Sequence, residues 1–123
     1  MYEQTVIVGR LGQDPEMRYI PNGDAVTNFS VAVNARWTAA DGEPRDRVTW
    51  YKVVCWGKLA ESTNRYLVKG RKVMVTARRI QAEAYLDCEG KPKAALKLTA
   101  DAVKFLDRPA GDRDDEDDAG MPF

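Results

Sequence analysis

Two tryptophans and a lysine occur at alternate positions of the segment RVTWYKVVCWG, residues 47–57. Because side chains alternate across a β-strand, Trp50, Lys52 and Trp56 would share one face, and the apolar residues between them would face a core. Indoles stack on bases and an ammonium group attracts phosphate, so this face has the chemistry of a surface for single-stranded nucleic acid. Burial of both tryptophans in a core or an oligomer interface is the alternative interpretation.

A second segment, residues 71–86, combines positive charge with an aromatic residue. Arg71, Lys72 and Arg78 lie along it, and Tyr85 is near its end. A basic strand that ends in an aromatic residue fits another part of such a surface. A solvated edge strand that is protected by its charges fits the same pattern.

Trp37 closes an earlier segment, residues 26–37, at a position typical of an exposed functional aromatic. Strand alternation argues against this, because Trp37 is in phase with Phe29 and Val33, which face inward. A bulge near residues 34–36 would let Trp37 face outward in spite of the alternation. Otherwise, Trp37 would cap the core.

Composition excludes the catalytic chemistries that need histidine, and catalysis by a carboxylate or a lysine remains open. Histidine is absent, which removes histidine-based nucleophilic catalysis and histidine-ligated metals. The two cysteines, Cys55 and Cys88, have no metal-ligand spacing, so we expect free thiols, no metal and no cofactor. A metal-dependent nuclease would have to use Asp14, Glu16 or Asp24, which surround a turn without a clustered partner. We therefore expect no enzymatic activity.

The elements that must position these residues are mostly strands. β-Branched and alternating patterns predict strands at residues 5–11, 26–37, 47–57, 71–86 and 94–106. Helical spacing occurs once, within residues 58–70, and PNGD at 21–24 predicts a tight turn. Five strands with one helix between the third and the fourth predict an all-β OB-fold, a small Greek-key barrel.

Charge divides the chain into two parts although the totals balance at 19 and 19. Residues 1–106 hold 17 Lys and Arg against 12 Asp and Glu, whereas residues 107–123 hold 2 against 7. We predict a basic folded domain at 1–106 and a disordered acidic tail at 107–123. No apolar run approaches ~20 residues and no secretory signal is visible, so we expect a cytoplasmic protein without membrane contact.

Several segments together resemble the bacterial single-stranded DNA-binding protein family. They are VIVGRLGQDPEMRYIPNGDAVTNFSVA, TWYKVVCWGKLAE, YLVKG and the end DDAGMPF. The resemblance covers residues 4–106 and the C-terminal tip. It implies an OB-fold that binds single-stranded DNA without strong sequence preference and protects it, a homotetramer, and association with the nucleoid.

The resemblance also assigns roles to residues. It implies base stacking by Trp37, Trp50, Trp56 and Tyr85. Phosphate contacts would come from Arg18, Lys52 and Lys58, and the basic strand adds Arg71, Lys72 and Arg78. Plausible positions in the oligomer interface are Val6, Val8 and Tyr51. The segment TARRIQAEAY is one residue longer than its counterpart in the family.

The C-terminal end has a chemistry of its own. An acidic run followed by Pro-Phe suits a hydrophobic pocket rimmed by Arg or Lys on another protein. By resemblance, this tip would recruit enzymes of DNA replication, recombination and repair. Its residues are Asp115, Glu116, Asp117, Asp118, Met121, Pro122 and Phe123. The alternative function is a primosomal or RNA-binding OB-fold adaptor, whose barrel mainly docks protein or RNA.

Overall fold

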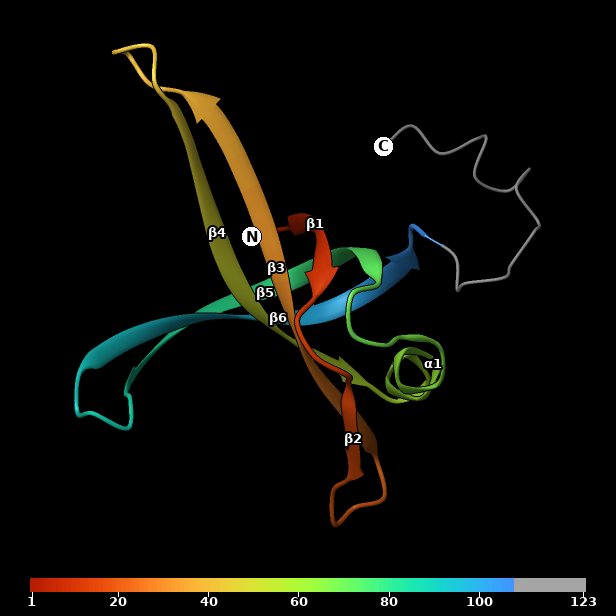
Figure 1. Cartoon of the computed structure of the whole chain (residues 1–123). Coiled ribbons are helices and arrows are strands. Elements are labelled where there is room, and N and C mark those ends of the chain that lie inside the picture. The colour runs from red at the N-terminus through yellow and green to blue at the C-terminus, as the bar shows by residue number, and fades with distance from the viewer. Residues whose placement is uncertain (108–123) are drawn as a thin grey trace.

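The computed structural model describes residues 1–107. Its elements are β1 (Thr5–Leu11), β2 (Glu16–Tyr19), β3 (Ala25–Thr38), β4 (Pro44–Trp56), α1 (Lys58–Tyr66), β5 (Lys72–Leu86) and β6 (Pro92–Phe105). Figure 1 shows the strands curled around a common centre, with the β3–β4 and β5–β6 hairpins reaching beyond it in different directions. The predicted partner-binding tip, from Asp115 to Phe123, lies outside the described residues.

The sheet closes into a barrel. Its strand order is β1-β5-β6-β4-β3-β2, and an additional pairing of β1 with β3 joins its ends. Arg10 is the point of closure, because it pairs with Lys72 of β5 and also with Ala32 of β3. The β4–β6 pair is parallel and the other pairs are antiparallel. This arrangement confirms the predicted five-stranded OB-fold, in which the helix follows the third barrel strand.

The short strand β2 was not predicted from the sequence. It pairs along the start of β3, with Glu16 opposite Asn28 and Tyr19 opposite Ala25. The predicted turn follows directly, and Ile20 N donates a hydrogen bond to Asp24 O at 3.0 Å. The segment has only four residues and all of them are at least partly exposed, so it shows no alternation that would indicate a strand.

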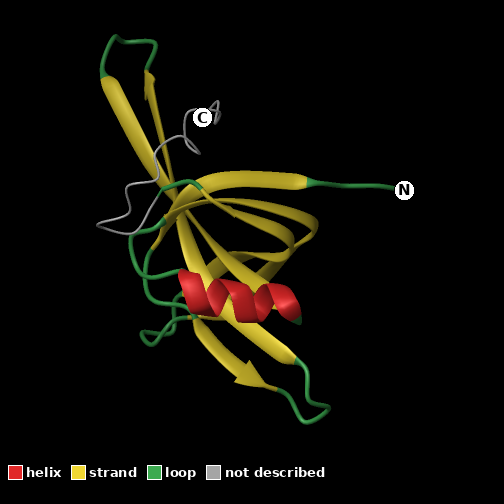
Figure 2. Ribbon diagram, turned by 90° about the vertical axis from the view of Figure 1, so that its right-hand side faces the viewer, coloured by secondary structure: helices red, strands yellow, loops and turns green. Residues whose placement is uncertain are grey.

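The interior is filled by alternate residues of the barrel strands. Its fully buried members include Val31, Val53, Val73, Val75 and Leu98. Figure 2 shows α1 lying against the barrel. The helix is fixed there by a buried hydrogen bond, in which Thr27 Oγ1 of β3 donates to Ala60 O at 2.7 Å. No helix within residues 1–107 is long and apolar enough to cross a membrane.

Strand β1 crosses β3 closely at Gly9. A Cβ atom at this position would overlap the backbone oxygen of Ala32, and it would lie 2.8 Å from Cγ1 of Val31. The backbone oxygen belongs to the β3 ladder and cannot rotate away as a flexible side chain could. Glycine at position 9 is therefore a condition for barrel closure.

The two thiols have opposite environments. Cys55 is fully buried in the core and Cys88 is exposed in the β5–β6 turn. Burial raises the pKa of Cys55 from 9.0 to about 12, although a hydrogen bond with Thr63 acts in the other direction. The unfolded chain therefore loses this proton first. The resulting stabilisation of the fold is complete below pH 9.0 and is lost as the pH rises towards about 12.

We expect a thiol reagent at about pH 8 to modify only Cys88 in the native protein, because the Cys55 thiol is protonated and inaccessible. In denaturant, Cys55 should react as well, so that two thiols per chain are modified. The absorbance of the chromophore that the reagent releases measures both reactions. Cys55→Ala should flatten the alkaline decline of the melting temperature above pH 9. Rapid reaction of two thiols in the native protein would contradict this assignment.

Candidate nucleic-acid interface

The outer face of β4 carries the residues that alternation placed there. Trp50 and Trp56 have 54% and 46% of their surface exposed, and Lys52 between them is also exposed. Val53 and Cys55 are fully buried on the opposite face. Neither indole fills the barrel core.

Strand pairing extends this face over neighbouring strands. Lys52 is paired with Ser30 of β3 and with Lys97 of β6, and Lys97 is paired with Gln81 of β5. Directly paired residues point to the same side of a sheet, so these four side chains form one polar row. A second row begins at Trp56, which is paired with Val26 of β3, and Val26 is paired with Arg18 of β2. The predicted basic residue Arg18 therefore joins the face.

A double irregularity turns Tyr85 to this same face. The β5–β6 register shifts between Thr76 and Ala77 and again between Ala77 and Arg79, which leaves Arg78 and Asp101 without a directly paired residue. Each strand gains one residue at the same place, so the inward and outward positions exchange on both strands. Val73, Val75 and Ala77 face the core before the irregularity. After it, residues of the same parity face outward, and Tyr85 is one of them.

Tyr85 is connected to the tryptophan face by Lys52. The Nζ atom of Lys52 lies 5.3 Å from the centroid of the Tyr85 ring, within the range of a cation–π interaction. The ring is 46% exposed. At the irregularity itself, the guanidinium Nε of Arg78 lies 3.3 Å from the Asp101 carboxylate.

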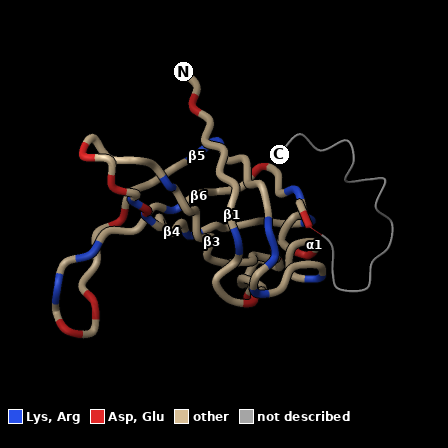
Figure 3. The backbone as a smooth tube through the Cα atoms, turned by 45° about the horizontal axis from the view of Figure 1, so that its top comes forward, with Lys and Arg blue, Asp and Glu red and all other residues tan. Residues whose placement is uncertain are grey.

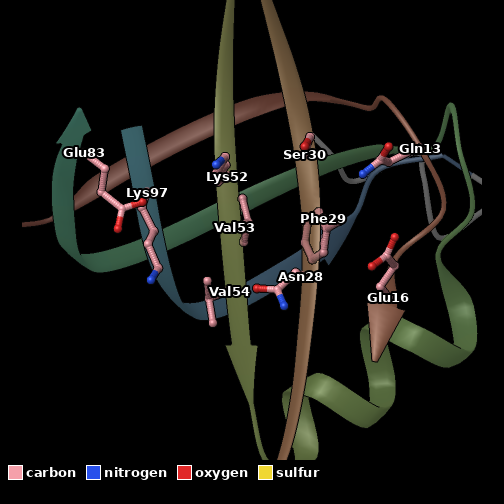
Figure 4. Close-up of a pocket in the computed structure, with 10 residues that line it drawn as sticks. All are labelled: Gln13, Glu16, Asn28, Phe29, Ser30, Lys52, Val53, Val54, Glu83 and Lys97. Carbon is pink, nitrogen blue, oxygen red and sulfur yellow. The ribbon is translucent and has the colours of Figure 1, made fainter. Parts of the chain in front are cut away.

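A groove of about 330 Å³ lies on this part of the barrel, and Lys52 is one of its lining residues. Figure 4 shows the residues that line it, on β2, β3, β4, β5 and β6 and the segment before β2. They are Gln13, Glu16, Asn28, Phe29, Ser30, Lys52, Val53, Val54, Glu83 and Lys97. Two cations and two carboxylates thus line the groove, and none of the four forms an ion pair with another described residue.

Trp50 is positioned by Gly12. A Cβ atom at position 12 would lie 2.5 Å from Cζ3 and 2.7 Å from Cη2 of the indole. The ring therefore rests on the backbone between β1 and β2, a place that a larger residue would occupy. This contact holds one edge of an otherwise exposed ring.

We expect Gly12→Ala to displace the Trp50 ring without unfolding the barrel, because the added methyl meets a side chain that can rotate away. Tryptophan emission should shift to longer wavelength and acrylamide quenching should increase. The far-UV circular dichroism spectrum should stay unchanged. Unaltered emission would mean that the indole does not rest on Gly12 in solution.

Trp37 lies on the long β3–β4 arm. Pairing is continuous from Val26 with Trp56 to Thr38 with Pro44, so no bulge precedes Trp37. Trp37 is also 45% exposed and does not cap the core. The predicted bulge before Trp37 and the predicted position of Trp37 as a cap on the core were therefore both wrong. Alternation does place Trp37 on the other side of the ribbon from Trp50, but the arm at this height has left the barrel (Figure 1), so both of its sides face solvent.

Two arginines lie close to Trp37. The guanidinium carbon of Arg47 lies 5.6 Å from the ring centroid, and Arg45 is paired directly with Trp37 across the arm. Figure 3 shows both signs of charge along the hairpins. Trp37 therefore belongs to a separate part of the surface, beside a hollow between Arg36 and Arg45.

Arg71 has a structural role that the sequence did not predict. It is only 8% exposed. Its Nε donates to Asp107 Oδ1 at 2.9 Å, its Nη1 to Tyr66 O at 3.0 Å, and its Nη2 to Asp107 O at 2.8 Å. Asp107 also accepts from Arg10 Nη1 at 3.3 Å. A buried guanidinium committed to these acceptors is not available to phosphate, which corrects the assignment of Arg71.

The remaining predicted basic residues lie apart. Lys58 opens α1 directly after the Trp56 strand and is exposed. Arg78 is exposed at the bulge, where an exposed ion pair binds it only weakly. Lys72 begins β5, opposite Arg10, beyond the bulge from the tryptophan face.

The predicted oligomer positions do not share one surface. Residues 5–9 of β1 pair with β5 on one side, and β3 pairs with β1 only at residues 10 and 11, so this stretch has an open edge. Val6 is 53% exposed there and Val8 is half-buried. Tyr51 instead pairs with Val31 and packs against the core.

Sequence reasoning missed the polar residues of the groove on β6 and β3. Lys97 meets Lys52 through a parallel pairing of strands that are distant in the chain. Its signal was the alternation of Leu96 and Leu98 with Lys97 and Thr99. That alternation could have assigned Lys97 to the outer face, but not to a place beside Lys52.

Sequence comparison gives the chain clear relatives. The profile of the Single-strand binding protein family matches residues 2–106. A single-stranded DNA-binding protein of Neisseria meningitidis serogroup B is 38% identical over 120 residues, 98% of this chain and 66% of the relative. One of Wolinella succinogenes is 35% identical over 107 residues, 87% of this chain and 65% of the relative. The chain thus spans just under two thirds of the length of these relatives.

Solved structures are similar in fold. One is described as "Plasmodium falciparum SSB complex with ssDNA"; its TM-score is 0.74 at 24% identity, over 87% of this chain and 97% of that one. A small single-stranded DNA-binding protein from Streptomyces coelicolor has a TM-score of 0.72 at 23% identity, over 85% and 94% of the two chains. At these identities the likeness concerns the barrel fold.

Proposed function

Because the chain belongs to the single-strand binding protein family, we propose that it binds single-stranded DNA without strong sequence preference and without catalysis. The observation that carries this proposal is the outer face of the barrel. Exposed Trp50 and Trp56 flank Lys52, whose ammonium group lies over the ring of Tyr85. Aromatic stacking platforms beside cationic side chains are the usual means of binding single strands.

Each group on the face has a role in this proposal. Bases stack on Trp50, Trp56 and Tyr85, and phosphates contact Lys52, Arg18 and Lys58. Lys97 adds a phosphate contact that lies beside Lys52. Trp37 binds a more distant part of the strand, because the arm carries it away from the groove. Lys72 and Arg78 are peripheral contacts in this arrangement.

The test is a titration of intrinsic tryptophan fluorescence with oligo-dT of about 35 nucleotides at low and at high salt. Stacking should quench the emission, and the logarithm of the affinity should fall with the logarithm of salt by about 0.7 per phosphate contact. No quenching at low salt would overturn the proposal. Competition by oligo-U that equals or exceeds that by oligo-dT would instead favour the RNA-binding adaptor.

The open edge of β1 supports an assembly. Unpaired strand edges recruit further strands, and exposed Val6 lies on this one. We infer that the chain forms homo-oligomers, as a homotetramer, through β1. Light scattering at several concentrations measures the mass, and a monomer at all of them would contradict this assembly.

The acidic C-terminal sequence supports a recruiting role. The tip residues combine acids with a terminal Pro-Phe, which suits a basic-rimmed pocket on replication, recombination or repair enzymes. The protein would then protect single strands and bring these enzymes to them, in the cytoplasm at the nucleoid. Removal of Pro122 and Phe123 should abolish capture of such enzymes and leave DNA binding intact.

A further inference from the structure

Two carboxylates line the groove in addition to its two lysines. In Figure 4, Glu83 stands on the β5 side of the groove and Glu16 on the β2 side. A carboxylate repels a phosphate group at short range, so neither residue assists a phosphate in this groove. Their presence points to a different part of the nucleotide, a hydrogen-bond donor on the base.

Glu83 keeps its acceptor capacity free. It is exposed, and the residue paired with it on β6 is Ala95, whose small side chain leaves the carboxylate uncovered. Within residues 1–107, Glu83 forms neither an ion pair nor a side-chain hydrogen bond, although Lys97 lines the same groove. The carboxylate is thus able to accept a hydrogen bond from a ligand.

A base stacked on Tyr85 would come within reach of Glu83. The two residues lie two positions apart on one face of β5, beyond the bulge at Arg78. This spacing corresponds to about 6.6 Å along a strand, close to the width of a base. The edge of the stacked base would therefore face the Glu83 carboxylate.

The bases differ in what they offer to a carboxylate. Cytosine and adenine carry an exocyclic amino group, which donates to Glu and Asp side chains in DNA recognition. Uracil and thymine have a carbonyl oxygen at the corresponding position, and their N–H group lies between two carbonyls that repel a carboxylate. A carboxylate beside the stacking site thus favours bases that carry an amino group.

We propose that Glu83 reads the exocyclic amino group of the base on Tyr85, and that Glu16, paired with Asn28, is a second acceptor across the groove. These residues bias a binding surface that is otherwise tolerant of sequence. The inference rests on the proposed binding of single-stranded DNA and adds a determinant of base preference to it.

The experiment compares oligo-dC with oligo-dU, each of about 35 nucleotides, at about pH 8. The two bases differ only at ring positions 3 and 4. Affinities are measured for the full chain, for Glu83→Gln, and for the control Glu61→Gln on α1, which removes the same charge away from the groove. The quantity of interest is the preference for dC over dU, because the effect of net charge cancels in this ratio.

The preference for dC should fall about three- to tenfold in Glu83→Gln, which corresponds to the net contribution of one typical hydrogen bond. It should stay within about twofold of wild type in Glu61→Gln. Equal preferences in all three proteins would overturn the role of Glu83 and leave the proposed DNA binding standing. Failure of the wild-type chain to bind either oligonucleotide would overturn both.

Discussion

Replacement of Trp50 and Trp56 together by alanine is expected to weaken binding of oligo-dT at least ~30-fold. Stacking contributes about 1–3 kcal/mol for each base, so the loss of two platforms corresponds to about 2–6 kcal/mol. Each single variant should lose about tenfold. The change is largest here because both rings are exposed on one face and flank the same cation. Anisotropy of fluorescein-labelled DNA measures it, since the protein's own fluorescence is reduced.

The matched control is Tyr66→Ala. Tyr66 is an equally exposed aromatic, at 53%, but it ends α1 and contacts the Phe105 ring at a tilt, away from the groove. Its removal should leave the affinity within about twofold of wild type. Comparable losses in the control and in the double variant would mean that the effect comes from general destabilisation. A loss below threefold in the double variant would remove the indoles from the binding surface.

Gly9→Ala is expected to have the largest effect on stability. The added methyl group would overlap the backbone oxygen of Ala32, and the β1–β3 crossing that closes the barrel would have to open. We expect a loss of about 3 kcal/mol or more in the free energy of unfolding, since overpacking against a backbone finds no rotamer to relieve it. Thermal unfolding measured by circular dichroism should show a melting temperature lower by roughly 10–20 °C.

The control for this change is Ala40→Val, which adds two methyl groups at an exposed position in the β3–β4 turn. It should change the free energy of unfolding by no more than about 0.5 kcal/mol. If Gly9→Ala had the same melting temperature as the control, the close approach of β1 to β3 would not exist in solution.

Local patterns predicted the parts of the site that depend on one strand. Alternation placed Trp50, Lys52 and Trp56 on one face without reference to any other element, and the barrel followed from the order of five strands and one helix. Strand β2 was missed, because it has only four residues and no buried member.

The parts that sequence could not supply depend on residues that are distant in the chain. Tyr85 reaches the outer face only because β5 and β6 both change register at Arg78 and Asp101. Arg71 was assigned to phosphate because its partner, Asp107, is 36 residues away. Strand parity predicted that Trp37 faces inward, whereas the family resemblance assigned it to base stacking. The parity is correct for the ribbon, but the arm extends past the barrel and the ring is exposed.

The hydrogen bonds that Asp107 accepts form a clamp, and this clamp has a mechanical consequence. Asp107 is the last described residue, and its carboxylate and carbonyl are held by Arg71, Arg10 and the backbone N–H of Lys72. A pull on the C-terminal segment would otherwise peel β6 from β5 one hydrogen-bonded pair at a time, starting where Phe105 pairs with Val73. With the clamp, tension spreads into β1, β5 and the end of α1 at once. The clamp is thus a tether point that resists in shear, and the groove strands behind it stay in register under tension.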